Sequence, residues 1–532
     1  MKNKILIIRI LITLLLSFLL FYIFLPPLNP TSIEFWVFLL FIVGVFFITS
    51  ALNLINITHV FKNIRSNTLK AGIIPMVIAG VFIVITLTNF FLSPLFRANS
   101  YSKRITINED VEFTKEVEKV DFNSLPLLDK ESSQKLGDRV MGQMPELVSQ
   151  FYVSNLYTQI NYNDSIIRVT PLEYNGFFKF FANRKDGVKG YITVDSVSGK
   201  ANLTKLEKGM KYMPSAMFSK NLYRHLRFNY PTLVFGEESF EIDNEGNPYW
   251  IVPIIKYEGV GIKRNVSGVV ILNPITGKSK KYDVKDIPTW VDHVYPAELI
   301  IEQVDDWGQY KNGFFNSIFG QKNVVETTRG YNYMAMDDDV FLYTGITSKA
   351  SDESNIGFIL TNMRTKETSF YKVPGAEEYS AMSSAEGQVQ QMNYTASFPL
   401  LINLNNRATY LLSLKDNAGL VKMYAFVDVE DYQKVVVTDA SKGIEIAAKN
   451  YLNEVSITGD SEELIDKEIT IKKITSAIID GTSYYYITDT ENQKYRVSIK
   501  VDKKNIPFLE AGNKITIQIS NETDVTEIES IK

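Results

Sequence analysis

The sequence predicts a membrane-anchored α+β protein in which three N-terminal transmembrane helices precede strand-rich modules and a small C-terminal β-barrel. Three observations lead to this fold class. The first 97 residues contain three long apolar runs with few charges. The remainder alternates apolar and polar residues over short stretches that end in turns, which is typical of strands. The chain contains no cysteine, so a fold held by disulfides is excluded.

The apolar runs near the N-terminus have the length of membrane spans. A hydrocarbon core about 30 Å thick requires about 20 helical residues. The runs cover Ile5–Leu25, Phe35–Leu54 and Ala71–Phe96. We therefore expect residues 1–97 to form a three-helix transmembrane anchor, with the lipid bilayer as a partner.

Basic residues orient these spans, because cytoplasmic loops carry an excess of lysine and arginine. The turn over residues 26–34 has no base, whereas the N-terminal tail and the second loop do: Lys2, Lys4, Lys62, Arg65 and Lys70. This distribution predicts a multi-pass protein of the cell membrane. Its N-terminus would be cytoplasmic and residues 98–532 would lie outside the cytoplasm.

The charge balance excludes one class of partner. The chain carries 60 acidic and 56 basic residues, a net charge of −4 at neutral pH. Nucleic-acid binding relies on a basic excess that neutralises phosphates, so we expect no nucleic-acid partner. The absence of cysteine also removes thiolate metal sites and cysteine nucleophiles, and it suits a large exported bacterial domain.

Beyond the anchor the sequence divides into five segments. An extended stalk is expected over residues 98–129. Helical periodicity followed by strands indicates α+β units over residues 130–210 and 211–320, and a third α+β or β-rich unit over residues 321–440. A linker helix and a small barrel are expected over residues 441–532.

A short motif recurs within these units. It reads glycine, apolar strand, Asx residue, turn glycine and lysine, and its first copy runs from Gly190 to Lys200. The second copy runs from Gly268 to Lys278, 78 residues later. A looser third copy over residues 357–366 is one residue shorter and lacks the turn glycine. Such repetition indicates a duplicated module.

A helix that leads into strands ending in Asx-x-x-Ser/Thr-Gly-Lys resembles the PepSY domain, a small α+β module of bacterial envelope proteins and protease propeptides. The resemblance covers residues 130–285 and extends loosely to 435. It implies helix-on-sheet modules with a binding or chaperone-like role. The segments Pro374–Met382 and Ser413–Val421 also resemble a group of uncharacterised Gram-positive membrane proteins, to which no activity is attached.

The C-terminal region reads as a series of strands separated by short turns, including Asp480-Gly481. The expected strands are Glu468–Ile474, Ser483–Thr488, Lys494–Val501 and Lys514–Ile519. About five strands in so short a region resemble an OB-type barrel. Alternation along the second strand places at least one of its three tyrosines, Tyr484 to Tyr486, in the barrel core.

No combination of residues commits the chain to a chemistry. His225 lies in an amphipathic helix-like segment, and His293 follows Asp292, so the two adjacent side chains point to opposite faces of an extended chain. A Gly-x-Ser-x-Gly elbow is absent. The segment Thr276–Ser279 resembles the end of a phosphate loop, but Leu272 replaces the required glycine.

Metal binding is not indicated either. The run Asp337–Asp339 lacks the alternate spacing of a calcium loop, and Asp243–Asn247 reads as a turn between strands. We therefore predict no catalytic, cofactor-binding or metal-ligating residues.

One loop is a candidate for interaction. Prolines bracket Trp290 and Tyr295, which predicts a rigid aromatic loop. Aromatic anchors of this kind are common at interfaces. The alternative is a loop that covers the core.

These observations predict a non-enzymatic cell-envelope scaffold or binding protein, with an envelope protein or the cell wall as its partner. One alternative is a cell-wall polymer hydrolase that uses dispersed carboxylates, which a cleft with two carboxyls about 5–9 Å apart would favour. The other alternative is a PepSY-type regulator of an extracellular protease. No oligomeric state is indicated.

Overall fold

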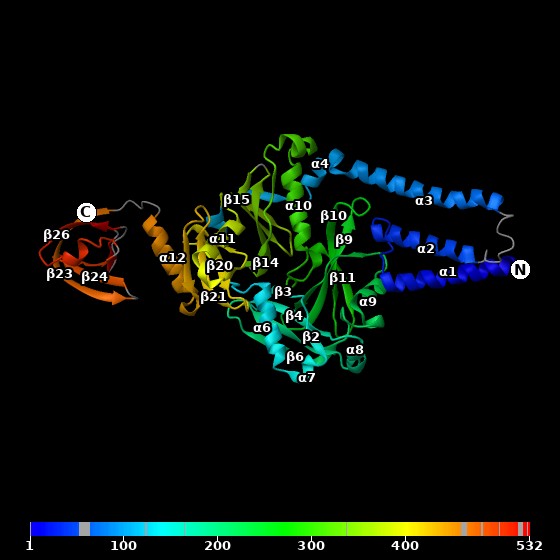
Figure 1. Ribbon diagram of the computed structural model, residues 1–532, viewed down its shortest axis with the longest axis horizontal. Helices are drawn as coiled ribbons and strands as arrows, with labels where there is room; N and C mark the ends of the chain where they lie inside the picture. Colours follow the sequence, from blue (N-terminus) through cyan, green and yellow to red (C-terminus); the bar gives the residue numbers. More distant parts are fainter. Residues whose placement is uncertain are drawn as a thin grey trace. The chain divides into compact units, whose positions relative to one another are not determined.

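The computed structural model describes all of the chain except Met1 and residues 53–63, 123–124, 164, 337, 350, 459–464, 480–481, 500, 520–524, 529 and 532. His59, Lys62, Asp337 and the Asp480-Gly481 turn therefore lie outside the described residues. The chain forms two compact units, Met1–Ala447 and Ala448–Lys532 (Figure 1). Helices combine with five β-sheets, which confirms the α+β part of the predicted fold class.

The chain begins with four helices: α1 (Lys2–Phe24), α2 (Ile33–Leu52), α3 (Ile64–Leu92) and α4 (Pro94–Ser102). Among the described residues, no single helix is both long and apolar enough to cross a membrane. The apolar parts of α1 and α2 among the described residues are shorter than these helices. They cover Ile10–Phe24 and Ile33–Phe46, below the length of about 20 residues that a span requires. One pair, Met76–Leu92 with Pro94–Ser102, has the length and composition of a span but is bent by 53°.

The prediction of three transmembrane helices is therefore wrong. The multi-pass localisation in the cell membrane, with a cytoplasmic N-terminus and residues 98–532 outside the cytoplasm, depended on those spans and is wrong with them. The bend between α3 and α4 falls at Ser93 and Pro94, where proline supplies no N–H to continue the helical hydrogen bonds.

The segment predicted to be a stalk is built into the larger unit. It contains β1 (Ile107–Val111) and α5 (Phe113–Glu116), and the side chains of Phe113 and Val117 are buried. Further along, Lys119 forms a parallel bridge with Asn403. The described residues between 98 and 129 are therefore part of the packed structure, because apolar side chains such as Phe113 and Val117 complete a core with distant strands.

Residues 130–210 form the first module, a helix followed by five strands. Its elements are α6 (Lys130–Gly142), β2 (Phe151–Val153), β3 (Thr158–Tyr162), β4 (Ser165–Tyr174), β5 (Val188–Asp195) and β6 (Ala201–Met210). Asp129 caps α6 by accepting a hydrogen bond from the Ser132 N–H. The sheet order is β2-β4-β5-β6, and β3 pairs with β4 beyond the end of β2. Strands β4 and β5 are joined through a short helix, α8 (Phe177–Asn183).

The same order of a helix and five strands recurs three times in the described part of the larger unit. The second module comprises α9 (Leu222–Asn229), β7 (Val234–Phe235), β8 (Ser239–Ile242), β9 (Pro248–Tyr257), β10 (Arg264–Leu272) and β11 (Ser279–Asp283). The third comprises α10 (Ala297–Tyr310), β12 (Val325–Thr327), β13 (Asn332–Met336), β14 (Asp339–Ser348), β15 (Ser351–Asn362) and β16 (Thr368–Tyr371). The fourth comprises α11 (Glu378–Gln388), β18 (Thr395–Ala396), β19 (Leu400–Leu404), β20 (Arg407–Lys415), β21 (Val421–Asp428) and β22 (Val435–Asp439).

These boundaries differ from the predicted ones in two places. The helix α10 lies within the predicted segment 211–320 but precedes the strands of the third module. The segment 321–440, predicted to be one α+β or β-rich unit, contains strands of two sheets, those of the third and fourth modules. The third sheet also carries two additional strands, β1 and β17 (Gly375–Ala376).

The recurring motif is the turn that joins the fourth and fifth strand of each module. In each turn an Asx Oδ1 accepts hydrogen bonds from the N–H groups two and three residues later, as in Asx turns generally. The four residues are Asp195, Asn273, Asn362 and Asp428. The turn glycines Gly199 and Gly277 have φ of 71° and 77°, and in the third copy Lys366 takes this position with φ of 66°. The third copy therefore has the same length, and a lysine replaces the glycine.

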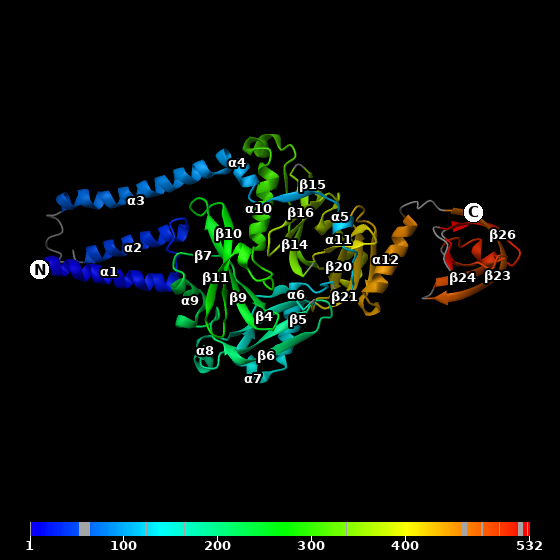
Figure 2. The ribbon, with the colours of Figure 1, turned by 180° about the vertical axis from the view of Figure 1, so that it is seen from behind.

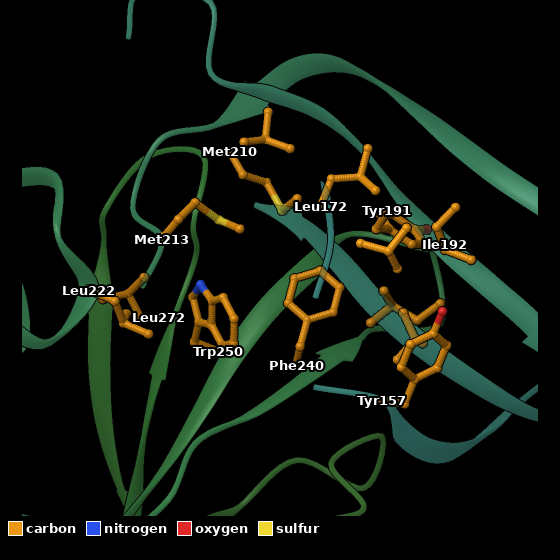
Figure 3. Close-up of a cluster of buried hydrophobic side chains, with 14 of the residues drawn as sticks. Tyr157, Leu172, Tyr191, Ile192, Met210, Met213, Leu222, Phe240, Trp250 and Leu272 are labelled. Carbon is orange, nitrogen blue, oxygen red and sulfur yellow. The ribbon is translucent and has the colours of Figure 1, made fainter. Parts of the chain in front are cut away.

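The modules are joined in series through shared cores. Phe240, Trp250 and Leu272 of the second sheet pack with Tyr191 and Met210 of the first (Figure 3). Helix α10 lies between the second and third sheets (Figure 1 and Figure 2) and contributes apolar side chains to their common core. Because burial of each large apolar side chain is worth about 1.5–3 kcal/mol, these shared cores fix neighbouring modules to one another.

The smaller unit is a six-stranded sheet, in the order β27-β25-β24-β23-β26-β28, that curls into a small barrel (Figure 1). Its strands are β23 (Ile465–Ile479), β24 (Thr482–Asp489), β25 (Lys494–Ser498), β26 (Lys514–Ile519), β27 (Thr526–Glu527) and β28 (Ser530–Ile531), and the helix α12 (Ile444–Thr458) precedes them. The C-terminal segment supplies both outer strands of this sheet, because β27 pairs with β25 and β28 pairs with β26. Tyr485 packs against the barrel core, as the alternation along β24 predicts.

Candidate functional site

A groove of about 820 Å³ lies on one face of the first sheet. Its floor is formed by alternate residues of β5 and β6. The register pairs Thr193 with Asn202 and Tyr191 with Thr204, so these four side chains share a face. The neighbouring Ile192 points to the opposite face, where it lies beside Gly137 of α6. One face of the sheet therefore packs against α6, whereas the other is covered by the second module at Tyr191 and lines the groove at Thr193 and Asn202.

The second module supplies a wall of this groove through the turn between β8 and β9. Asp243 Oδ1 accepts hydrogen bonds from the N–H groups of Glu245 (3.1 Å) and Asn247 (2.8 Å), which confirms the predicted turn. Tyr191 Oη donates to the carbonyl of Gly246 at 2.8 Å. Burial raises the pKa of Tyr191 to about 12, so its phenol stays protonated and keeps this hydrogen bond at neutral pH.

The groove reaches the outer edge of the first sheet. Five consecutive residues of β6, Thr204 to Lys208, line it. Because successive strand residues point to opposite faces, a hollow that all five line must extend around the edge of the strand. A bulge contributes to this shape, since Val188 pairs with Met210 but Gly190 pairs with Lys205.

The chemistry of the groove is polar, with charges of both signs. Its floor carries the hydroxyls of Tyr191, Thr193 and Thr204 and the amide of Asn202. Lys200, Lys205 and Lys208 line it and are exposed, and within the described residues none of them forms an ion pair. Glu207 and Glu245 are also exposed. The groove therefore offers many hydrogen-bonding groups and free cations to a ligand.

The predicted interaction loop lies elsewhere, over the second core. Tyr295 is buried, and its N–H donates to the Met363 carbonyl at 3.0 Å. Trp290 is half-buried and contacts the Tyr249 ring, with 5.0 Å between ring centroids. The two aromatic rings thus have different neighbours, and only Trp290 keeps an accessible surface. Its role at an interface stays a prediction.

The two histidines outside the N-terminal region bond to main-chain carbonyls. His225 Nε2 lies 2.8 Å from the Gly277 carbonyl oxygen, and His293 Nε2 lies 2.7 Å from that of Gln159. Among the described residues, no group of three or more acidic or histidine side chains has the arrangement of a metal site.

A buried polar cluster, which the sequence did not indicate, joins the first two modules. Glu241 accepts hydrogen bonds from the N–H groups of Asp292 (2.9 Å) and His293 (3.2 Å), and Asp292 accepts one from the N–H of Asn161 (2.8 Å). Burial, with the nearby charge of Glu241, raises the pKa of Asp292 well above its ordinary value. Asp292 is 51 positions from Glu241 and 131 positions from Asn161, so no local signal relates them. Glu241 also accepts a hydrogen bond from the Ser239 hydroxyl (2.7 Å). The cluster is thus bonded to groups within the fold and fixes the loop in place.

Two other buried carboxyls have raised pKa values. Burial raises the pKa of Glu173 to about 7, and its Oε2 accepts hydrogen bonds from the N–H and hydroxyl of Ser215. Burial raises the pKa of Asp306 to about 6, and its partner is Arg104. Neither carboxyl lines the groove.

Known proteins provide no guide to the chemistry of the groove. The resemblances to the PepSY domain and to an OB-type barrel stay predictions. No protein-family model matches the chain, and no curated protein matches it either.

Proposed function

We propose that the chain is a non-enzymatic binding protein or scaffold that holds an extended polymeric ligand in the groove of its first module. The observation that supports this proposal is the groove itself. It is open along a strand edge and is lined by hydroxyls, amides and lysines that form no ion pair with any described residue. Polar groups placed in a groove of this kind fix the orientation of a ligand through hydrogen bonds. The envelope setting expected from the sequence depended on three membrane spans and is not retained.

The carboxyl groups of the groove do not favour hydrolysis. Glycoside hydrolysis needs one carboxyl held in its protonated form opposite a second, ionised one. Asp195 Oδ1 is occupied by the N–H groups of Val197 and Ser198. Glu207 is exposed on the strand β6, and Glu245 is exposed in the turn between β8 and β9. The buried carboxyls that could retain a proton lie outside the groove.

The proposal is tested by filling the groove. We expect Asn202→Trp to weaken binding at least tenfold, because the indole would occupy the floor of the groove. Lys280→Trp is the matched control, since Lys280 pairs with Ile271 as Asn202 pairs with Thr193. Binding of short acidic peptides and of soluble peptidoglycan fragments would be measured by titration calorimetry.

Either probe class that binds in an Asn202-dependent manner supports the groove as a binding site. Equal binding by both variants and the unsubstituted chain, or no binding of either probe, would overturn it. Release of smaller products from the peptidoglycan fragments would identify a hydrolase instead.

A further inference from the structure

We propose that the ligand of the groove is an extended acidic peptide that pairs as an additional strand with the free edge of β6. This inference rests on the proposed function and names its ligand class. In the described part of the chain β6 pairs with β5 alone and is the last strand of its sheet. The main chain of a sheet edge presents N–H and C=O groups that another extended chain can pair with.

The third module shows such an added strand at the equivalent edge. Its fifth strand, β16, corresponds to β6, yet β16 carries β1 on its outer side. The two strands run parallel, with Ile107 opposite Thr368 and Asn108 opposite Ser369. The segment that contains β1 comes from far outside the module, so this edge accepts a strand from elsewhere.

The correspondence between the two edges is residue by residue. In the first module, Val194 lies one position before the turn residue Asp195, and Ala201 lies six positions after it. These two residues pair with each other. In the third module Thr361 pairs with Thr368 at the same positions relative to Asn362. Ala201 therefore corresponds to Thr368, where pairing with β1 begins.

The main-chain groups of β6 are available for this pairing. The Asp195 N–H donates to the Lys200 carbonyl at 2.9 Å, which makes these two residues a hydrogen-bonded pair. Bonded and non-bonded pairs alternate in an antiparallel ladder. The N–H and C=O groups of Ala201, Leu203 and Lys205 consequently point away from β5. The bulge beyond Lys205 limits the edge to about five residues.

The charge of the edge indicates the chemistry of the peptide. Lys200, Lys205 and Lys208 are exposed and, as noted, unpaired within the described residues. The β1 segment, which occupies the corresponding place in the third module, contains Glu109 and Asp110. The alternative role of these lysines is to prevent edge-to-edge pairing between two molecules. If this were their only role, an acidic peptide would not bind.

The probe is a labelled synthetic peptide with the sequence of residues 105–113, which carries three acidic and no basic residues. Its binding to the full chain would be followed by fluorescence anisotropy. We expect Lys205→Pro to weaken binding at least tenfold, because it removes an edge N–H that β5 does not use. Asp283→Pro is the matched control, since Asp283 pairs with Gly268 as Lys205 pairs with Gly190.

A second measurement leaves the protein unchanged. Methylation of alternate peptide nitrogens removes the donors needed for a ladder, and we expect it to abolish binding. In hydrogen exchange, the bound peptide should slow the amides of Ala201, Leu203 and Lys205. Those of Asn202 and Thr204, already bonded to β5, should change little.

The outcomes separate this inference from the proposed function. Peptide binding that is sensitive to Asn202→Trp but leaves the β6 edge amides unprotected would overturn strand addition while the groove remains a binding site. A change in the hydrogen-exchange rates of residues 368–371 would show that the peptide replaces β1 beside β16. That result would also overturn strand addition at β6. A peptide that does not bind the unsubstituted chain would overturn strand addition, and binding of peptidoglycan fragments alone would assign the groove to another ligand.

Discussion

Gly268 and Gly357 stand where the main chain of the next strand leaves no room for a side chain. A Cβ at Gly268 would lie 2.1 Å from the Tyr282 carbonyl oxygen, and one at Gly357 would lie 2.2 Å from that of Tyr371. The first glycine of the recurring motif is therefore explained by close approach of two strands. The second glycine of the motif is explained by the left-handed conformation of the turn. Lys366 adopts this conformation in the third copy, so a residue with a side chain can also take it, at some cost.

Substitution of a motif glycine is expected to destabilise the fold. For Gly357→Ala the free energy of unfolding should fall by about 1–3 kcal/mol, because the methyl group forces β15 and β16 apart. Urea denaturation followed by circular dichroism would measure it. Gly387→Ala is the control, since an added Cβ in this exposed part of α11 meets nothing within 4 Å. That control should be neutral or stabilising by up to about 1 kcal/mol. Equal stability of the two variants would contradict this explanation.

The carboxyl of Glu173 should make stability depend on pH. Burial raises its pKa from 4.5 to about 7 in the folded chain, so the folded state holds a proton that the unfolded state has released. Stability from this group is therefore complete below about pH 4.5 and is lost as the pH rises to about 7, by up to about 3 kcal/mol. We expect Glu173→Gln to flatten the fall in unfolding free energy over this window.

Denaturation titrations at several pH values would test this expectation. Glu207→Gln alters an exposed carboxyl and is the control. An unchanged pH dependence in Glu173→Gln would show that another group is responsible.

At the scale of elements, the sequence predicted much of the strand pattern but not the number of modules. Local signals were sufficient where an Asx residue and a glycine mark the turn, as at Asp195 and Asn273. The fourth module was merged with the third because its turn lacks the glycine and is one residue longer, with Val427 opposite Val435. The sequence of residues 98–129 alone predicts an extended stalk. The structure of this segment depends instead on distant partners, because β1 pairs with β16 and Lys119 pairs with Asn403.

The shared core makes a single element important to two modules. Trp250 of β9 is fully buried among residues of both sheets. We expect Trp250→Ala to cost about 3–5 kcal/mol. Hydrogen exchange should then show faster amide exchange in β4 and β5 as well as in β9 and β10. Loss of protection confined to β9 and β10 would mean that the two modules unfold independently.

At the scale of the whole molecule, the groove could not be predicted because it belongs to two modules. Tyr191 and Gly246 are 55 residues apart and meet only when both sheets have folded. The buried Glu241–Asp292 cluster has the same origin. The periodicity of a sequence describes each strand by itself. It does not show which loop of one sheet will lie beside the groove of another sheet.

The division into two compact units leads to a further expectation. The barrel has its own core of residues such as Ile471, Val497 and Ile517. A fragment of residues 465–532 should therefore fold alone, although a barrel of this size has a stability of only about 3–5 kcal/mol. Circular dichroism and calorimetry of the fragment would show a cooperative transition. A fragment without such a transition would show that the barrel depends on the preceding helix.

The placement of β1 beside β16 sets an order of events during synthesis. Residues 107–111 leave the ribosome early, whereas their partner residues 368–371 are made about 260 residues later. At about 5–20 residues per second, this interval is on the order of 10–50 s. The first two modules can complete their sheets during this time, but β1 must wait. A nascent chain paused after the second module should therefore expose β1 to protease, and release of the complete chain should protect it.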